Sequence, residues 1–193
     1  MISFIVATYN RPKNLKVLLD CLIAQDNDDW ECLVMDEGDN RHIIPNDARF
    51  KYHPITRVMP FPNEPRGSFG LLPKQHGIQY ALGDWVCFPC DDVYYVPQFV
   101  SIMANATKNP SDIIACDFVY DRNDYNVPKT HPKVGGISSC NYIIKKDCIG
   151  NTKFSEFFSD IAHMGIADGL FIEKLVAGGA SFQRIPKALM VYN

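Results

Sequence analysis

The sequence has no long hydrophobic run and no excess of basic residues. Its longest apolar stretches, such as residues 2–7, are far shorter than the roughly 20 residues that cross a bilayer. No basic segment precedes that stretch, as it would in a secretory signal. A net charge of −3 and a pI near 5.9 argue against a nucleic-acid groove, which needs clustered Lys and Arg. These absences predict a cytoplasmic protein with no transmembrane segment and no nucleic-acid partner.

Several common catalytic motifs are also missing. There is no GxxxxGK[ST] segment, which excludes a P-loop kinase, and no GxSxG elbow to support a hydrolase triad. One CxxC spacing joins Cys87 and Cys90. No second pair of Cys or His residues accompanies it to complete a zinc site, and Cys87 lies within an apolar run. The seven cysteines are scattered and odd in number, so reduced thiols are expected.

Short, continuous apolar runs recur through the first 119 residues and predict strands of a parallel sheet that is covered on both faces. These runs are residues 2–7, 30–35, 50–55, 85–88 and 113–119. Three helices are predicted between them: one begins near Pro12 with Asn10 as its cap, one spans 74–82 before Gly83, and one runs from Pro97 to about residue 108. The proline-rich residues 60–73 predict a loop. This alternation predicts an α/β fold with a mostly parallel sheet flanked by helices.

The remaining residues, 120–193, are less regular. Residues 120–136 are polar and contain proline, which predicts a loop. The later elements predicted are a strand at 142–144, a helix over 167–177 and strands at 181–185 and 188–192. We interpret residues 1–193 as a single domain in which the α/β region 1–119 is followed by a second half, 120–193.

Acidic residues follow predicted strands or begin a helix, where open α/β sheets place their ligands. They are Asp36, Asp91, Asp92 and Asp168. The pair Asp91 and Asp92 offers the hard oxygen ligands that suit Mg²⁺ or Mn²⁺, ions that usually also bind substrate phosphates. Lys74, with His76 or Arg66, is a candidate for further positive charge near a diphosphate. The alternative is that the acidic pair only caps the next helix or forms a polar turn.

Three segments, taken in order, resemble the family 2 glycosyltransferases with the GT-A fold. The first, ISFIVATYNRPKNLKVLLDCLIAQDNDDWECLVMDEGDN, is similar to that family's first strand, TYNR turn, first helix and acidic strand end. The second, GLLPKQHGIQYALGDWVCFPCDDVYYVP, is similar to its basic residue, Gly-Ile, and DxD turn. The third, ADGLFIEKLVAGGASFQRIPKALMVYN, is similar to its acidic helix start and closing strand. The resemblance covers nearly the whole chain.

The resemblance implies an inverting enzyme that moves a sugar from a nucleotide diphosphate, with UDP favoured, to a hydroxyl of a glycan or glycoconjugate acceptor. It implies that residues 1–119 bind the nucleotide sugar and that 120–193 face the acceptor. The implied donor-binding residues are Thr8, Tyr9, Asn10, Arg11, Asp36 near the base, Lys74 and Asp91. Asp91 and Asp92 would hold Mn²⁺ or Mg²⁺ at the diphosphate, and Asp168 would be the general base.

Two departures from the family pattern weaken parts of this prediction. Cys90, a soft thiol, stands where the first aspartate of DxD is expected, and Tyr192 and Asn193 stand where some relatives have a metal-binding His. A second hypothesis is therefore a sugar-nucleotide or glycan-binding module that keeps the fold without the chemistry. The sequence fits both a minimal enzyme and the N-terminal domain of a longer protein.

Overall fold

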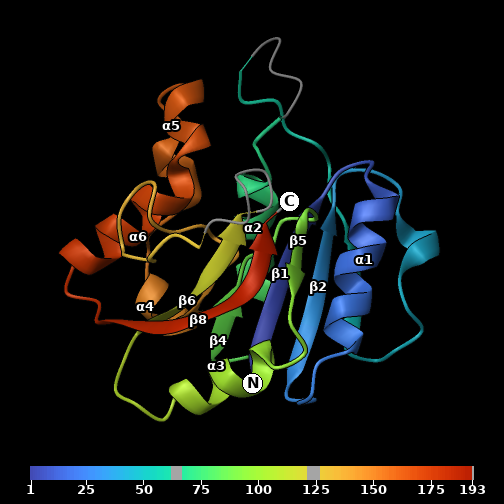
Figure 1. The fold of residues 1–193 in the computed structure, drawn as a ribbon. Coiled ribbons are helices and arrows are strands. Elements are labelled where there is room, and N and C mark those ends of the chain that lie inside the picture. The colour runs from blue at the N-terminus through green and yellow to red at the C-terminus, as the bar shows by residue number, and fades with distance from the viewer. Residues whose placement is uncertain (62–66, 121–126, 193) are drawn as a thin grey trace.

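Eight strands within the described residues, 1–61, 67–120 and 127–192, form one mixed sheet in this computed structural model (Figure 1). The strands are β1 (Ile2–Thr8), β2 (Trp30–Asp36), β3 (Phe50–Pro54), β4 (Trp85–Cys87), β5 (Val93–Tyr95), β6 (Ile113–Tyr120), β7 (Tyr142–Lys145) and β8 (Phe182–Tyr192). Their order across the sheet is β3-β2-β1-β4-β7-β6-β8-β5. The predicted α/β fold with a mostly parallel sheet is confirmed. Residues 62–66, with the candidate Arg66, residues 121–126 and Asn193 lie outside the described residues.

Strand direction decides which residues meet at each edge of the sheet. β1 pairs in parallel with β2 and β4, β2 with β3, and β6 with β8. β7 is antiparallel to both β4 and β6. The amino end of β7 therefore lies at the same edge as the carboxyl ends of β1, β2, β4 and β6. Open α/β sheets bind their ligands at this edge.

Helices cover both faces of the sheet (Figure 1). α1 (Pro12–Ile23) and α3 (Phe99–Ala106) pack on one face, and α2 (Leu71–Gly77) and α6 (Ala167–Ala177) pack on the other. The apolar run of β1 is continuous because its side chains alternate between hydrophobic clusters on the two faces of the sheet. Phe4 and Val6 belong to one cluster and Ile5 to the other. Burying a side chain of this size contributes about 1.5–3 kcal/mol. The prediction of strands covered on both faces is confirmed for β1 and β2, which are buried along their whole length.

α2 approaches the sheet closely at Gly77. A Cβ atom at this position would meet Ile5 Cγ2 at 2.3 Å and Met35 Cγ at 3.2 Å. The absence of a side chain lets the helix lie directly on β1 and β2. Contact at this end of α2 fixes the height above the sheet of Lys74, which lies one turn earlier in the helix.

Three elements differ from the sequence prediction in their boundaries by more than one residue. α3 spans Phe99–Ala106 and is shorter than the predicted 97–108. α2 begins at Leu71 rather than at 74, because Pro73 lies in the first turn, where a helix needs no backbone N–H from it. It ends at Gly77 and continues as a 3₁₀ turn, Ile78–Tyr80. The two predicted strands at 181–185 and 188–192 form a single strand, β8, whose register against β6 shifts on either side of Asp117. Pro186 lies at this bulge, where its missing N–H costs no ladder hydrogen bond.

The structure also contains short elements that the sequence did not predict. They are β5, α4 (Lys146–Ile149), α5 (Ile161–Gly165) and 3₁₀ turns at Arg41–Ile43 and Phe154–Phe157. Asn10 does not cap α1: the capping position is Arg11, which makes no side-chain capping bond, and Asn10 takes φ 50 in the preceding bend. Gly83 does not end a helix but packs against the first residues, since a Cβ there would lie 2.6 Å from the Met1 carbonyl oxygen.

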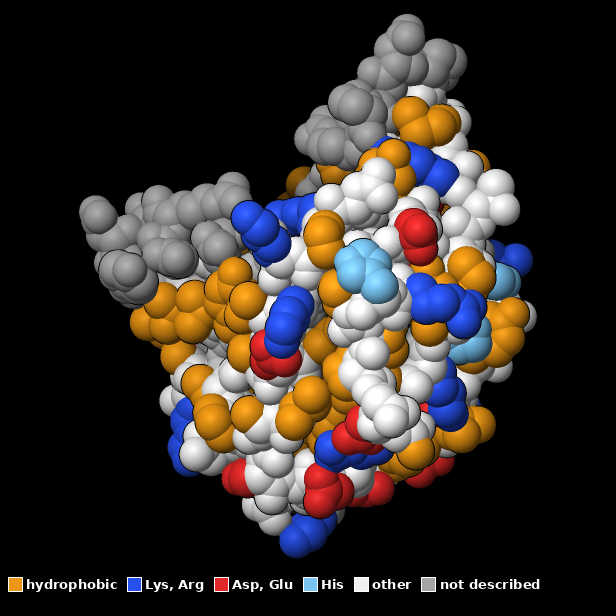
Figure 2. All heavy atoms as spheres, turned by 90° about the vertical axis from the view of Figure 1, so that its right-hand side faces the viewer, with side chains coloured by type: hydrophobic (Ala, Val, Ile, Leu, Met, Phe, Trp, Pro, Cys, Tyr) orange, Lys and Arg blue, Asp and Glu red, His pale blue; other side chains and the backbone are white. Residues whose placement is uncertain are grey.

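Charges of both signs are interspersed with apolar and uncharged side chains on the face seen from the right-hand side of Figure 1, where no continuous field of Lys and Arg is present (Figure 2). Within the described parts of the chain, no helix has the length and apolar character needed to span a membrane.

Candidate active site

An acidic pair held by an arginine lies at the carboxyl edge of the sheet, in the turn between β4 and β5. Asp91 accepts a hydrogen bond from Thr8 Oγ1 at 2.9 Å and one from Arg11 Nη1 at 2.6 Å. The same Arg11 nitrogen lies 3.3 Å from Asp92 Oδ2. Thr8 ends β1 and Arg11 precedes α1, so the parallel pairing of β1 with β4 brings these residues to the acidic turn.

The acidic pair carries more negative charge than Arg11 neutralises. Burial raises the pKa of the Asp91 carboxyl to about 6, against the opposing effects of Arg11 and the Thr8 hydroxyl, and the neighbouring Asp92 raises it further. Asp92 Oδ1 is buried and has no hydrogen-bond partner among the described residues. One more cation at this turn would therefore stabilise the ionised pair.

Asp36 is fully buried at the end of β2, and its own turn uses its carboxylate. Its oxygens accept hydrogen bonds from the backbone N–H of Gly38 at 2.8 Å, from the backbone and side chain of Asn40 at 2.7 and 3.0 Å, and from the Tyr52 hydroxyl at 3.0 Å. The next residue, Glu37, lines a hollow that Asp91 and Asp92 also line. Burial raises the pKa of Glu37. Asp36 thus orders the turn that presents Glu37.

Tyr9 and Asn10 form the bend between β1 and α1. Tyr9 lines the hollow, and the guanidinium of Arg57 lies 3.4 Å from the centre of its ring. Asn10 is exposed and packs against Gly38, where a Cβ atom would come within 2.4 Å of Asn10 Oδ1. The turns that follow β1 and β2 therefore fit together through a glycine.

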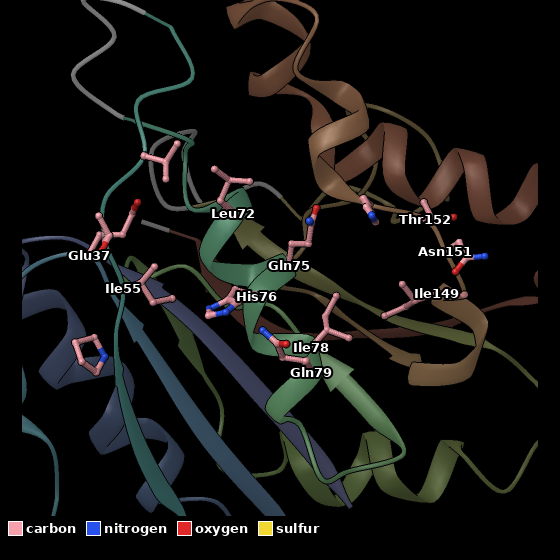
Figure 3. A pocket seen from close by; sticks show the side chains of 15 residues that line it. Glu37, Ile55, Leu72, Gln75, His76, Ile78, Gln79, Ile149, Asn151 and Thr152 are labelled. Atoms are coloured by element: carbon pink, nitrogen blue, oxygen red, sulfur yellow. The ribbon is translucent and has the colours of Figure 1, made fainter.

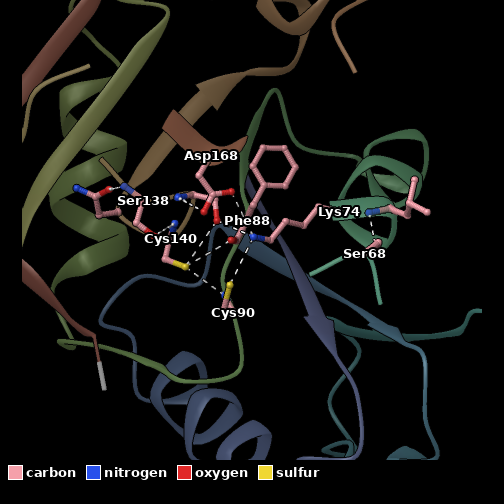
Figure 4. Close-up of polar contacts among 10 residues, drawn as sticks. Ser68, Lys74, Phe88, Cys90, Ser138, Cys140 and Asp168 are labelled. Carbon is pink, nitrogen blue, oxygen red and sulfur yellow. Dashed lines mark hydrogen bonds and ion pairs between the residues drawn. The ribbon is translucent and has the colours of Figure 1, made fainter. Parts of the chain in front are cut away.

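Lys74 lies beneath the acidic turn. Its side chain is 1% exposed, and its Nζ atom donates a hydrogen bond to Ser139 Oγ at 2.7 Å. The same atom is 3.4 Å from Cys90 Sγ and 3.7 Å from Asp168 Oδ1 (Figure 4). Cys90 lines the hollow and Lys74 does not, so Lys74 is connected to the hollow through Cys90.

Asp168 lies in the first turn of α6, at a second hollow. Its Oδ2 atom accepts a hydrogen bond from the Ser139 backbone N–H at 3.2 Å. Its Oδ1 atom is buried, has no hydrogen-bond partner among the described residues and lies on the side of Lys74. This carboxylate is therefore held by a backbone N–H at Oδ2 and lies beside an ammonium group at Oδ1.

Two hollows adjoin at Tyr192. The first has a volume of about 590 Å³, and its lining includes Thr8, Tyr9, Arg11, Glu37, Cys90, Asp91 and Asp92. The second, of about 270 Å³, is lined by Asp168 together with Phe118, Tyr120, Ser138 and Ile166. Tyr192 lines both, and its ring stacks on that of Tyr120 at 5.3 Å with an interplanar angle of 6°. The acidic turn and Asp168 thus face neighbouring spaces across one aromatic wall.

A larger hollow, of about 820 Å³, lies on the other side of α2 (Figure 3). Leu72, Gln75 and His76 from α2 line it, opposite the segment that holds Asn151 and Thr152. Among the described residues that the sequence singled out, only His76 lines it, so the structure places His76 away from the acidic turn. It touches the first hollow only in sharing Glu37 as a lining residue.

The acidic turn is the place where a metal would bind, but it offers few protein ligands. Over residues 1–61, 67–120 and 127–192, no group of three or more His, Cys, Asp or Glu side chains is arranged to hold a metal ion. A metal at Asp91 and Asp92 would need its remaining ligands from a bound diphosphate and water, the arrangement that Mg²⁺ commonly adopts.

The structure brings most of the predicted residues together. Thr8, Tyr9, Arg11, Asp91 and Asp92 line the first hollow. Of the other predicted residues, Lys74 and Asp168 lie beside it and contact each other, while Asn10 and Asp36 lie in its supporting turns.

Three lining or linking residues were not found from the sequence. Glu37 follows Asp36 in the same acidic turn, so its position directly after the end of a strand was an available signal. Ser139 precedes β7, which runs opposite to its neighbours, and no local pattern marks it. Tyr192 ends β8 and was considered only as a residue in place of a metal-binding His.

One family model covers most of this chain. The model of the family described as Glycosyl transferase family 2 matches residues 3–165. Protein CgeD of Bacillus subtilis (strain 168) is 29% identical over 108 residues, which are 53% of this chain and 25% of CgeD.

Solved structures show the same fold. S. aureus TarS 1–349 superposes with a TM-score of 0.77 and 21% identity over 100% of this chain and 60% of the TarS chain, and TarS 1–349 is also known in complex with UDP and with UDP-GlcNAc. The mannosyltransferase PcManGT from Pyrobaculum calidifontis, in complex with GDP-Man and Mn²⁺, superposes with a TM-score of 0.70 and 17% identity over 98% of this chain and 56% of its own. This chain spans a quarter of CgeD and no more than 60% of these structures.

Proposed function

Because this chain belongs to glycosyl transferase family 2, we propose that it moves a sugar from a nucleotide diphosphate donor to an acceptor hydroxyl with inversion. The observation that carries this proposal is the pair of adjoining hollows, one with Asp91 and Asp92 and the other with Asp168, on either side of Tyr192. Transfer by direct displacement needs the diphosphate and the attacking hydroxyl on opposite sides of one carbon, held in a fixed orientation.

We place the donor nucleotide in the hollow of about 590 Å³. Thr8, Tyr9, Asn10 and Arg11 border the nucleotide in this proposal. Asp36 acts near the base by ordering the turn that presents Glu37, whose carboxylate would accept the ring N–H that both uracil and guanine offer. UDP is the first choice of nucleotide, since TarS 1–349 is known in complex with UDP and with UDP-GlcNAc. GDP is the second choice, since PcManGT is known in complex with GDP-Man.

Asp91 and Asp92 are the residues that would hold a divalent ion, Mn²⁺ or Mg²⁺. The unpartnered Asp92 Oδ1 and the raised pKa of Asp91 both fit a site that accepts one more cation. When bound, such an ion neutralises the charge that develops on the diphosphate leaving group. Arg11, which contacts both carboxylates, would offer its remaining N–H groups to the phosphate oxygens.

Lys74 would support the donor from below. Its ammonium group lies 3.4 Å from Cys90 Sγ, and Cys90 lines the hollow, so its positive charge acts on the diphosphate through one intervening residue. By the resemblance, the thiol of Cys90 stands in the place of the first DxD aspartate, and the buried ammonium group of Lys74 lies beside it.

Asp168 is the proposed general base. The proton of the acceptor hydroxyl moves to the carboxylate of Asp168, and the hydroxyl oxygen forms a bond to the anomeric carbon. The bond from that carbon to the diphosphate oxygen breaks, and its electron pair leaves with the nucleotide diphosphate. The backbone N–H of Ser139 donates a hydrogen bond to Oδ2 of Asp168, which keeps the base in one orientation during the transfer.

We assign the acceptor, a glycan or glycoconjugate, to the hollow of about 270 Å³, where Tyr120 and Tyr192 offer aromatic surface for a sugar ring. Residues 1–119 would bind the nucleotide sugar and residues 120–193 would face the acceptor. The second candidate is a module that binds a sugar nucleotide without transfer, which Cys90 in the acidic turn favours.

Thermal unfolding of the purified chain with UDP, GDP, dTDP and CMP compounds, each with Mn²⁺ and with chelator, tests donor binding. A shift with one diphosphate that requires the metal supports both the donor class and the acidic site. Release of free nucleotide from the matching sugar nucleotide then separates the enzyme from the binding module. No shift with any compound would overturn the proposal.

A further inference from the structure

Lys74 is a charged side chain buried in the centre of the site, and its surroundings explain how the fold tolerates it. Removing an ammonium group from water is costly unless charged or polar partners replace the water. Lys74 extends from α2 toward the end of β4 and the start of β7, where Cys90 and Asp168 lie near its nitrogen (Figure 4). Ser139 Oγ accepts a hydrogen bond from the same nitrogen. Asp168 is the carboxylate in this set.

Ser139 links Lys74 to Asp168 through two separate groups. Its hydroxyl oxygen accepts a hydrogen bond from Lys74 Nζ at 2.7 Å, and its backbone N–H donates one to Asp168 Oδ2 at 3.2 Å. The direct ion pair, at 3.7 Å, reaches the other oxygen, Oδ1. Both oxygens of Asp168 are therefore oriented from the same side, one by the ammonium group and one by the residue that the ammonium group holds.

The groups that face Asp168 come from four parts of the fold. They are Lys74 from α2, Cys90 from the turn after β4, Cys140 and Tyr142 at the start of β7, and Tyr192 at the end of β8. Burial raises the pKa of both tyrosines, and the hydrogen bond to Cys140 together with burial raises that of Cys90. Lys74 is the member of this set that carries positive charge.

Cys140 is the possible competitor of Asp168 in this set. Burial opposes ionisation of its thiol, but the hydrogen bond from Cys90 and the nearby Lys74 lower its pKa. A thiolate at Cys140 would share the charge of Lys74 with Asp168, so a Cys140→Ser variant belongs in any test.

We propose that Lys74 is a positioning residue, which holds the carboxylate of Asp168 charged and oriented at the wall of the second hollow through the ion pair and the Ser139 bridge. This inference rests on the proposed function in taking Asp168 as the base. It assigns to Lys74 a role on the acceptor side, in addition to the support of the donor through Cys90. A single buried cation would then act on both substrates.

The test is a ¹³C NMR titration of the Asp168 carboxyl, assigned with Asp168→Asn, in the wild type and in Lys74→Met. The Met variant should move the Asp168 midpoint upward by about one pH unit or more, because a buried carboxylate loses its cation. Lys74→Arg should keep the wild-type midpoint, and Lys16→Met, on the exposed face of α1, should leave it unchanged. Cys140→Ser should leave it unchanged or lower it. An unchanged midpoint in a folded Lys74→Met protein overturns the proposal.

Kinetics supply a second measurement. In Lys74→Met, kcat should fall by about tenfold or more, and the acid limb of its pH profile should move upward with the NMR midpoint. Loss of donor affinity by calorimetry with an unshifted pH profile would mean that Lys74 acts on the donor alone. If Lys74→Met does not fold, Ser139→Ala takes its place and should move the midpoint in the same direction.

The NMR titration does not depend on turnover. A wild-type protein that turns over no donor would overturn the proposed function, and the Asp168 midpoint would still decide whether Lys74 controls the carboxylate.

Discussion

Arg11 Nη1 lies 2.6 Å from Asp91 Oδ1, so a cation of the protein already occupies part of the site in which a divalent ion would bind. Arg11→Gln removes this competitor. We expect Mn²⁺ alone to bind the variant about tenfold more tightly, since both carboxylates lose a positive neighbour. Titration followed by the EPR signal of free Mn²⁺ measures this directly. Arg49→Gln, which breaks a similar contact with Asp47 far from the site, should leave Mn²⁺ affinity unchanged.

Asp92→Asn should abolish the part of donor binding that depends on metal, because it removes a carboxylate whose Oδ1 has no hydrogen-bond partner among the described residues. Calorimetric titration with the donor, with Mn²⁺ and with chelator, makes the measurement. Asp39→Asn is the matched control, since Asp39 is exposed in a neighbouring turn. If donor affinity in Asp92→Asn still depends on Mn²⁺ to the same extent, the metal does not bind at this turn.

Asp168→Asn should lower kcat by on the order of 10²-fold or more and leave the donor Kd unchanged, because the amide cannot accept the hydroxyl proton. Initial rates of nucleotide release give kcat, and calorimetry gives Kd. Asp160→Asn makes the same substitution at an exposed helix cap and should keep full activity. A smaller loss at Asp168 would mean that another group takes the proton.

Glu31 predicts a pH dependence of stability away from the site. Burial opposes its ionisation, but hydrogen bonds from Lys51, Ser3 and the Leu82 N–H lower its pKa below the ordinary 4.5. The ionised form is favoured in the folded state, so its contribution is complete above pH 4.5 and is lost as pH falls through the lower folded pKa. Glu31→Gln should cost about 1–3 kcal/mol at pH 7.

Urea unfolding at pH 7 and at pH 3 tests this assignment. The difference between wild type and Glu31→Gln should shrink at pH 3. Asp20→Asn, on the surface of α1, should change the free energy of unfolding by no more than about 0.5 kcal/mol at either pH. An equal difference at both pH values would show that Glu31 contributes by packing and not by charge.

Gly77→Ala should destabilise the protein by about 1–3 kcal/mol and lower activity as well, because an added methyl group would push α2, and with it Lys74, away from Ile5. Gly165→Ala is the control for stability alone, because Gly165 lines the second hollow: a Cβ atom at that position meets nothing within 4 Å. Thermal unfolding and initial rates measure both effects. A Gly77→Ala protein with normal stability would mean that α2 can shift at no cost.

The sequence predicted the sheet well where burial is continuous. β1 and β2 are apolar on both faces and were placed within one residue of their observed ends. β8 was divided at Pro186, because a bulge that accommodates proline inside a strand has no signature separate from a strand end. β5 has three residues and was missed, because its pairing with β8 is a long-range contact.

The candidate site was predicted in part for a similar reason. Thr8, Arg11, Asp91 and Asp92 follow strands that run in parallel, so the rule for parallel sheets brings them together. The position of Ser139 depends on a strand that runs in the opposite direction, which local patterns do not show. The roles of the site residues, the metal and the cytoplasmic location remain predictions.

Tyr192, as a wall of both hollows, has a consequence for the rate law. The Tyr192 ring lies between the two hollows, so a shift of the ring toward the ligand in one hollow enlarges the other hollow. Binding of the first substrate then changes the affinity for the second, and the coupling free energy is the same in either order. For donor and acceptor bound on either side of Tyr192, plots of 1/rate against 1/[donor] at several acceptor concentrations would give lines that intersect above or below the horizontal axis.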